Sequence, residues 1–222
     1  MFKQVSFLAI LALGASSLYA QEGSMPVKLG VKIGVPVTDM FSASNTSLFN
    51  GNLPGSTFSS TVPRYEVGAS AEFRLPYKLR LEVDGLYKRG GFSGFAPYGA
   101  GLPDANIRST FNQWEIPALF KYNLALGHFR PFVDAGPTMR HISGISQSAF
   151  ASVPFESFSS NTLALHNRNS FGAVAGFGIT FKKGPFELTP EARYTRWANE
   201  AFQTNGLRTN LDQGDVLLGI SF

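Results

Sequence analysis

Hydrophobic and polar residues alternate strictly between Trp114 and Met139, in two runs that a short turn separates. In the first run the even positions are apolar or aromatic, whereas the odd positions carry Glu115 and Lys121. In the second run, which begins at Phe129, the odd positions are apolar. An alternation of period two is typical of β-strands, because successive side chains point to opposite faces. The segment therefore predicts a β-hairpin with one apolar face and one charged face.

The same alternation recurs along the chain and predicts eight strands. In each strand every second residue is uncharged, and the complementary positions carry the charged side chains. Four prolines fall inside these strands, and each removes a backbone donor, so we expect a bulge or a nearby strand end at Pro117, Pro131, Pro137 and Pro190. The predicted strands cover residues 27–37, 65–75, 77–87, 114–124, 129–139, 171–181, 186–194 and 216–222.

The links between the predicted strands alternate in length. Short links occur at Pro76, at residues 125–128 and at residues 182–185. The other four links are long and cover residues 38–64, 88–113, 140–170 and 195–215. Alternation alone fits both a soluble barrel with an apolar core and a lipid-embedded barrel with a polar interior. Short turns at one end and long loops at the other favour the second.

The placement of glycines and aromatic residues also favours a membrane barrel. Glycine crowds the polar face, which suits a narrow interior. Aromatic residues lie near both ends of the apolar face, as in the girdles of membrane barrels. They are Tyr77, Tyr122, Phe129, Phe181, Phe186 and Phe222 at one end, and Tyr65, Tyr87, Trp114, Phe171 and Tyr194 at the other. The sequence therefore predicts an all-β chain, an eight-stranded antiparallel up-and-down transmembrane β-barrel.

Composition adds limits to this prediction. The chain has 222 residues and no cysteine, which excludes disulfides and cysteine-based metal sites. A net charge of +4, spread along the chain, argues against nucleic acid as a partner. Residues 1–20 contain one lysine, then an apolar run, then small residues ending at Ala20, a pattern that predicts a secretory signal peptide. The barrel domain is then expected to cover residues 21–222.

Several short motifs carry a family resemblance. They are Trp-Glu-Ile-Pro at 114–117, Phe-Lys-Tyr at 120–122, Pro-Phe-Val-Asp-Ala-Gly-Pro at 131–137 and Glu-Ala-Arg-Tyr at 191–194. Together they resemble the bacterial outer-membrane β-barrel domain family, within the OmpA/OmpX-like group that is often labelled a porin family. The resemblance implies an eight-stranded barrel of the outer membrane, in contact with lipid and lipopolysaccharide. Phe222 is similar to the C-terminal residue by which the barrel-assembly machinery recognises such chains, although Leu217 stands where that signal usually has glycine.

The charged face of the predicted strands holds eight basic and eight acidic residues. Because an eight-stranded barrel is just wide enough for side chains to fill it, we expect a neutral salt-bridge network that plugs the interior. The alternative is a narrow polar channel lined by the same residues. If the network exists, Glu115→Ala should markedly lower the unfolding midpoint. The residues are Lys28, Lys32, Arg74, Lys78, Arg80, Lys121, Arg130 and Arg193 against Glu66, Glu72, Glu82, Asp84, Glu115, Asp134, Glu187 and Glu191.

One histidine offers candidate chemistry. His141, Ser143 and Glu156 keep an order and a His-x-Ser spacing similar to those of outer-membrane lipid A deacylases. A base beside a serine, oriented by a carboxylate, is what ester hydrolysis requires. The opposing interpretation is a strand end that enters a serine-rich loop, and we favour it because no other deacylase motif is present. No cofactor or metal site is expected, since His128 and His166 lie far from His141 in the sequence.

The long links are the remaining candidates for function. Their phenylalanines predict either a partner surface or loops that pack over the barrel mouth. We therefore expect a non-enzymatic structural or surface-binding platform, with a small porin-like channel as the alternative and a lipid A hydrolase as a third possibility. The phenylalanines are Phe41, Phe49, Phe58, Phe92, Phe95, Phe150, Phe155, Phe158 and Phe202.

Overall fold

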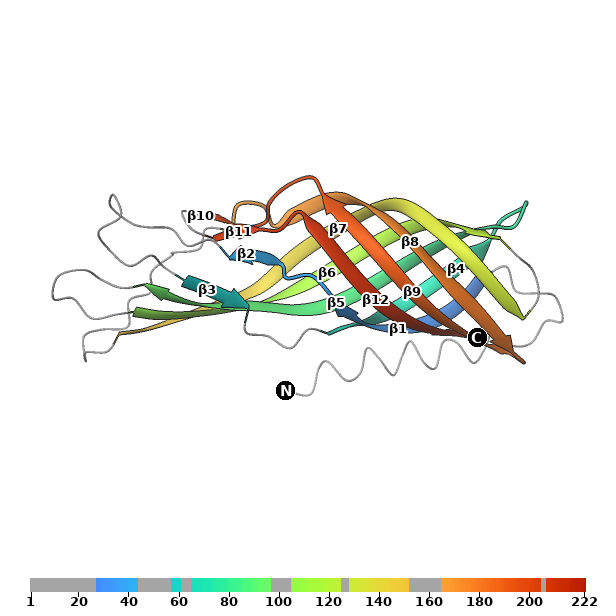
Figure 1. The fold of residues 1–222 in the computed structure, drawn as a ribbon, viewed down its shortest axis with the longest axis horizontal. Coiled ribbons are helices and arrows are strands. Elements are labelled where there is room, and N and C mark those ends of the chain that lie inside the picture. The colour runs from blue at the N-terminus through green and yellow to red at the C-terminus, as the bar shows by residue number, and fades with distance from the viewer. Residues whose placement is uncertain are drawn as a thin grey trace.

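Eight long antiparallel strands close into a barrel in the computed structural model (Figure 1). The structure describes residues 27–43, 57–60, 65–96, 105–124, 128–151, 165–204 and 207–222. Strands that follow one another in the chain pair with each other, and β1 pairs with β12 to close the wall. The eight are β1 (Val27–Pro36), β4 (Glu66–Arg74), β5 (Leu79–Ala96), β6 (Ala105–Asn123), β7 (Phe129–Ala151), β8 (Asn169–Lys183), β9 (Phe186–Trp197) and β12 (Asp212–Ser221). The predicted eight-stranded antiparallel up-and-down barrel is confirmed.

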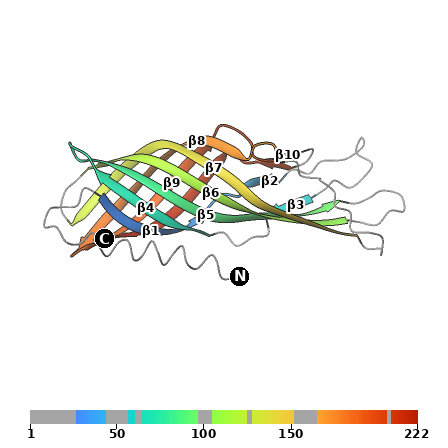
Figure 2. The ribbon, with the colours of Figure 1, turned by 180° about the vertical axis from the view of Figure 1, so that it is seen from behind.

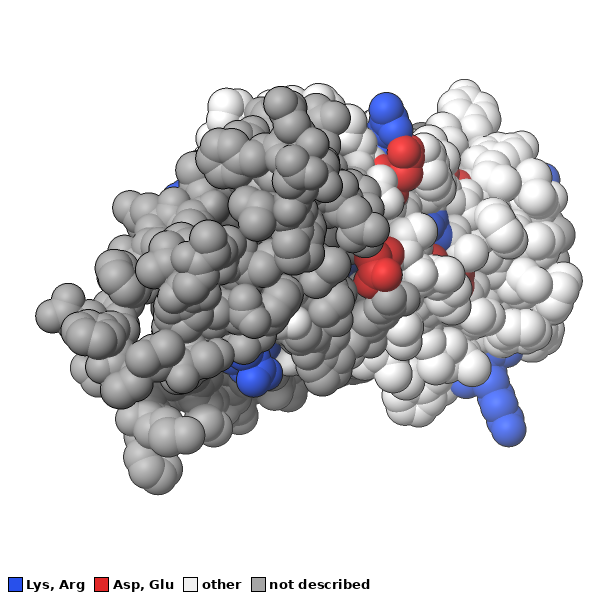
Figure 3. Space-filling view, turned by 60° about the vertical axis from the view of Figure 1, so that its left-hand side comes forward, with Lys and Arg blue, Asp and Glu red and all other residues white. Residues whose placement is uncertain are grey.

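The outer wall of the barrel is apolar. Side chains alternate between the lumen and the outside along each strand, and large hydrophobic residues such as Phe171 and Phe177 are more than 60% exposed on the outside. Figure 3 shows much of the described wall as a white surface, with red and blue side chains beside the grey region and a few blue ones projecting elsewhere. No helix in the described ranges is long and apolar enough to cross a membrane.

Three strands continue far beyond this wall. Residues 88–113 and 140–151 were expected to belong to long links, but β5, β6 and β7 pair through them as far as Ala96, Ala105 and Ala151. Beyond Tyr87, the nine further residues of β5 add about 30 Å of strand at the usual rise per residue. The prediction of loops there was wrong, because backbone pairing between neighbouring strands needs no apolar alternation. Figures 1 and 2 show this extension as a narrow sheet that projects from one end of the barrel.

Four minor strands lie at the same end as the extension. The strand β3 (Thr57–Ser60) adds to the edge of β5. The other three form a small separate sheet. They are β2 (Phe41–Ala43), β10 (Gln203–Thr204) and β11 (Leu207–Thr209).

The four prolines all lie within observed strands, and one of them, Pro131, lies near a strand end. At Pro117 and Pro190 the pairing with the neighbouring strand is interrupted over a short stretch. The register is the same on both sides of the interruption, so no residue is inserted and there is no bulge. Beside the first interruption, Gly136 lies so close to β6 that a Cβ atom there would overlap the carbonyl oxygen of Ala118. The one register shift in the described β6–β7 pairing lies between Thr110 and Asn112. The expected position near a strand end is found at Pro131, two residues after the start of β7. Pro117, Pro137 and Pro190 lie at omitted pairs without an inserted residue, so the expectation of bulges there was wrong.

The end of the barrel with the short turns holds one unusual hairpin. The turn between β4 and β5 contains Tyr77 and Lys78, both with positive φ values, 61° and 64°. Sequence periodicity placed Tyr77 at a strand start and Lys78 on the inner face, but both side chains are exposed in the turn. The prediction was wrong because the hairpin is tighter than the alternation suggested, and β5 begins only at Leu79.

Candidate functional site

Charged side chains fill the lumen in layers, and the first layer lies near the short turns. Glu187 on β9 binds Lys28 of β1 and Arg130 of β7, and Arg80 lies 3.7 Å from the same carboxylate. Arg80 also binds Glu72. We call this group the Glu187 layer. It joins strands from opposite sides of the barrel, so its ion pairs cross the lumen.

The second layer is centred on Glu82 of β5. Its carboxylate binds Lys32, Lys121 and Arg193, which come from three other strands. Lys32 Nζ also lies 3.1 Å from Asp84 and 3.1 Å from Glu191. Arg193 lies 2.7 Å from Asp84 and also binds Glu191. All six side chains of this Glu82 layer are at least 95% buried. A cavity of about 20 Å³ lies between the two layers, which is room for about one water molecule.

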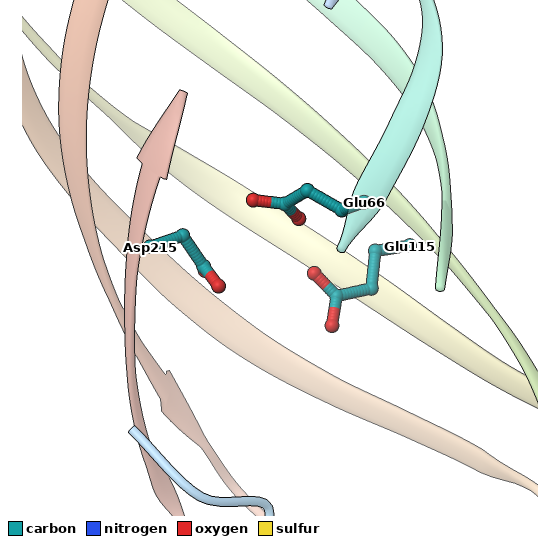
Figure 4. Close-up of side chains that lie close together, drawn as sticks. All are labelled: Glu66, Glu115 and Asp215. Atoms are coloured by element: carbon teal, nitrogen blue, oxygen red, sulfur yellow. The ribbon is translucent and has the colours of Figure 1, made fainter. Parts of the chain in front are cut away.

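The third layer is built around one ammonium group. Lys88 Nζ lies 2.8 Å from Glu66, 3.1 Å from Glu115 and 3.1 Å from Asp215. Figure 4 shows these three carboxylates approaching one another from β4, β6 and β12. Gln213 donates to Glu115 and Asp215, and Gln113 donates to Glu115 at 2.5 Å. We call the four charged residues the Lys88 layer.

Above the Lys88 layer, polar contacts give way to aromatic ones. The guanidinium of Arg140 lies over the ring of Trp197, 4.2 Å from its centre, and both side chains are almost fully buried. Trp197 Nε1 in turn donates to Gln213 at 3.1 Å. Next comes a cluster that we call the aromatic cap, in which the rings are 5.0–6.1 Å apart. Its members are Phe41, Phe92, Phe111, Ile142, Ala201 and Phe202.

The aromatic cap shows what three of the link phenylalanines do. Phe41, Phe92 and Phe202 are buried over the barrel mouth, as one of the two sequence interpretations expected. For the other link phenylalanines the side chains lie outside the described part of the structure. They are Phe49, Phe58, Phe95, Phe150, Phe155 and Phe158.

Most of the predicted interior charges do lie in these layers, with exceptions. Arg74 and Lys78 are exposed near the short turns and form no ion pair within the described residues, so their assignment to the lumen was wrong. Asp134 is buried opposite Lys121 in the β6–β7 register, but its carboxylate has no ion-pair partner among the described side chains.

Three interior charges were missed, and each lies one residue beyond a predicted strand. Lys88 follows the expected end of β5, Arg140 follows that of β7, and Asp215 precedes the expected start of β12. All three continue the alternation of their strands. Extending the pattern by one residue at each of these boundaries would have found them.

The histidine candidate is only partly assembled. His141 is half-buried on the outer face, and its Nδ1 lies 2.7 Å from Oδ1 of Asn169. Ser143 lies two residues further along the same strand, and Glu156 lies outside the described residues. The contact that orients this imidazole therefore comes from an amide on β8.

The Lys88 layer is also where a metal ion could be held. Carboxylate oxygens of Glu66, Glu115 and Asp215 lie within 4.8 Å of one another. However, the ammonium of Lys88 contacts all three carboxylates, so it supplies the cation that the cluster requires. A divalent ion would have to displace it.

Comparison with known proteins identifies the family. Residues 19–196 match the family model described as the outer membrane protein beta-barrel domain. The chain belongs to this family. It is a protein of the bacterial outer membrane. By the usual arrangement of such barrels, the short turns face the periplasm and the long links face outward.

Among solved outer-membrane barrels to which the chain is similar, OprG shares the fold with a TM-score above 0.5. OprG of Pseudomonas aeruginosa has 13% identity and a TM-score of 0.54, covering 88% of this chain and 94% of its own. Neisserial surface protein A has 14% identity and a TM-score of 0.44, covering 90% and 98%. Ail of Yersinia pestis, in complex with sucrose octasulfate, has 11% identity and a TM-score of 0.38, covering 89% and 98%. No curated protein matches the sequence.

Proposed function

We propose that this outer-membrane barrel is a non-conducting, non-catalytic platform that presents an extended β-sheet outside the membrane for surface binding. The observation that carries the proposal is the difference between the lumen and the strand extension along the barrel axis. Ion-paired and aromatic side chains lie across the lumen in successive layers, whereas β5, β6 and β7 continue beyond the apolar wall as a paired sheet. Such an extension offers a binding surface outside the membrane.

The packing of the lumen supports the absence of conduction. Glu82, Asp84, Lys121 and Glu191 lie in mid-barrel with side chains at most 5% exposed. Their ion pairs connect strands across the lumen, so an ion that passed through would have to separate buried opposite charges, which is costly. The aromatic cap adds an apolar barrier above them.

The extension supports surface binding because of its construction. In the described pairs, β5 and β6 remain in register from Gly90↔Phe111 to Ala96↔Ala105. β7 stays paired with β6 up to Ala151, and β3 adds a fourth strand at the edge of β5. A rigid sheet positions its exposed face and loops more accurately than an unsupported loop can. A sheet edge also offers backbone groups to a partner strand.

The conductance of the folded protein tests the closed lumen. Refolded protein, shown to be folded by its altered gel mobility before boiling, should give no discrete openings in a planar lipid bilayer. A large porin added to the same bilayer serves as the positive control. Regular openings by the refolded barrel would contradict the closed lumen and support the narrow channel instead.

Two epitope insertions test the presentation of the sheet. A tag inserted in the link 97–104, between β5 and β6, should be labelled by antibody on intact cells. The same tag inserted at Gly184, in the short turn between β8 and β9, should be labelled only after the outer membrane is permeabilised. Equal labelling of both tags on intact cells would contradict the proposed orientation.

Lipid A analysis tests the absence of catalysis. Cells that overproduce the protein should contain unchanged lipid A by mass spectrometry. Loss of an acyl chain, abolished by His141→Ala, would overturn the non-catalytic part of the proposal.

A further inference from the structure

The periplasmic rim of the barrel carries a hairpin whose sequence is unfavourable for its shape. Tyr77 and Lys78 occupy the two central positions of the turn between β4 and β5, with φ values of 61° and 64°. Leu75 donates to the carbonyl of Leu79 across this turn, at 3.0 Å. Two successive left-handed residues define the type I′ turn, which strongly favours Asn-Gly because other side chains are strained there. The turn therefore keeps Tyr-Lys at a cost in stability.

Both side chains of the turn are available to a partner. Tyr77 is 89% exposed and Lys78 is also exposed, and the Tyr77 phenol and the Lys78 ammonium form no hydrogen bond or ion pair within the described residues. The backbone carbonyl of Lys78 accepts from the backbone N–H and from Nδ2 of Asn123, both at 3.2 Å. Asn123 fixes the backbone of the turn, but no contact within the described residues holds the two side chains. The choice of Tyr-Lys over the favoured Asn-Gly therefore points to a contact that these side chains make outside the protein.

The exposed charged side chains that the structure describes at this rim are all basic. Among the described residues, the exposed Asp, Glu, Lys and Arg side chains beside the short turns are Arg74, Lys78, Lys182 and Lys183. At the outer end the signs are mixed: Asp39 is exposed, and Arg196 contacts Asp212 at 2.5 Å. Within the described residues, the periplasmic rim thus has no exposed Asp or Glu side chain to balance its basic groups.

The positions of these basic groups indicate what kind of partner they face. Arg74 and Lys78 belong to the β4–β5 hairpin, and Lys182 and Lys183 to the β8–β9 hairpin. Going around the barrel wall, β6 and β7 separate the two hairpins in one direction, and β12 and β1 separate them in the other. The hairpins therefore lie on opposite sides of the barrel. One compact partner could not easily contact both, whereas the surrounding lipid leaflet contacts both at once.

The apolar residues next to these groups belong to the lipid-facing wall. Phe186 is 58% exposed and follows Lys183 in the hairpin, where the two face each other in the β8–β9 register. Phe129 is 55% exposed and packs on Phe181 with ring centres 5.5 Å apart. Aromatic rings at interfacial depth, with lysine ammonium groups extending toward the water, are the arrangement that contacts lipid headgroups.

We propose that the periplasmic rim binds the phosphate groups of anionic phospholipids in the inner leaflet, at two opposite sites. One site consists of Arg74, Tyr77 and Lys78, and the other of Lys182, Lys183 and Phe186. Basic side chains attract anionic headgroups over a short, salt-dependent range. The inference does not rest on the proposed platform function, since it concerns the opposite end of the barrel.

Two tryptophan reporters can measure lipid composition at each site. Replacing Trp114 with Phe leaves Trp197, which is 1% exposed inside the lumen, as the remaining native tryptophan. Tyr77→Trp then reports on one site and Phe186→Trp on the other. Each reporter is placed in phosphatidylcholine vesicles, and its fluorescence quenching by brominated phosphatidylglycerol is compared with quenching by brominated phosphatidylcholine. We expect a preference for phosphatidylglycerol of roughly threefold at low salt, which 1 M NaCl removes.

Two double variants with equal charge change provide the control. Arg74→Gln with Lys78→Gln should abolish the preference at position 77 and leave it intact at position 186. Lys182→Gln with Lys183→Gln should do the reverse. Equal loss at both reporters would show a general effect of net charge and overturn the two local sites. An absent preference in both unmodified reporters would overturn the proposal without depending on how any charge variant folds.

The stability of a turn variant tests the backbone strain at Tyr77 and Lys78 independently of lipid binding. Tyr77→Asn with Lys78→Gly supplies the sequence that the turn prefers, so the urea unfolding midpoint should rise. An unchanged or lower midpoint would show that the Tyr-Lys turn carries no strain, and would remove one of the two observations behind the first site.

Discussion

The Glu82 layer and the Lys88 layer pair their buried charges in different ways. In the Glu82 layer, three cations and three carboxylates share many contacts, and Lys32, Glu82 and Arg193 each have more than one partner of opposite charge. In the Lys88 layer, three carboxylates share a single ammonium. A buried charge is costly when it loses all its partners and much less so when it keeps one. The first layer is therefore tolerant of single losses, and the second depends on one residue.

The largest expected effect is the loss of Lys88. Lys88→Met keeps the length of the side chain but leaves Glu66, Glu115 and Asp215 together without their shared cation, so we expect a loss of about 3–5 kcal/mol in the free energy of unfolding. The urea midpoint, read from gel mobility, measures it. Lys182→Met, the same change at an exposed position, is the control. Adding Glu66→Gln to Lys88→Met should recover part of the loss.

Glu115→Ala should have the next largest effect. Lys88 would keep Glu66 and Asp215, but the amides of Gln113 and Gln213 would lose a common acceptor. We expect a loss of about 2–3 kcal/mol, since buried donors would be left unpaired. An unchanged midpoint would count against the network as a source of stability.

Glu82→Gln should have a smaller effect, although Glu82 forms three ion pairs, as Lys32 and Arg193 also do. Lys32 and Arg193 would each keep Asp84 and Glu191, and Lys121 would keep Glu72 at 3.6 Å. We expect a loss of about 1–2 kcal/mol, measured in the same way. If this change cost more than Lys88→Met, the contrast between the layers would be wrong.

The smallest effect belongs to an ion pair outside the lumen. Arg196 and Asp212 lie 2.5 Å apart on neighbouring strands, with side chains 55% and 44% exposed. Exposed pairs are screened by water and salt, so Arg196→Gln should leave the urea midpoint unchanged within error. A clear drop would show that exposed pairs at the barrel rim contribute as much as buried ones.

The sequence predicted the barrel well because the wall separates lipid from a polar lumen. That separation imposes a strict alternation on every strand between the two ends of the wall, as from Trp114 to Tyr122. The same argument identified Lys32, Glu82 and Glu191 as lumen residues. Their partners could not be predicted, because they come from strands far apart in the sequence.

The prediction failed where the apolar face ends. Lys88, Arg140 and Asp215 continue the alternation of the inner face, but the next outward positions are not apolar, so the predicted strands ended one residue too early. These outward residues are Arg89, His141 and Gly214. The extension of β5 through Gly90 and Gly94 was missed for the same reason: its pairing depends on backbone hydrogen bonds and not on an apolar face. The burial of Phe41, Phe92 and Phe202 depends on three separate links meeting at one point, which local patterns do not encode.

The pairing of β1 with β12 has a consequence for how the barrel assembles. Lys32 belongs to β1, yet its partners Glu82, Asp84 and Glu191 lie on β5 and β9. Until the first and last strands meet, the sheet is open and these charges can remain hydrated. Closure must then expel the water and form the cross-lumen contacts together. We therefore expect the last step of folding to be slow, all-or-none and sensitive to charge changes such as Lys32→Gln, whereas the earlier hairpins form independently of it.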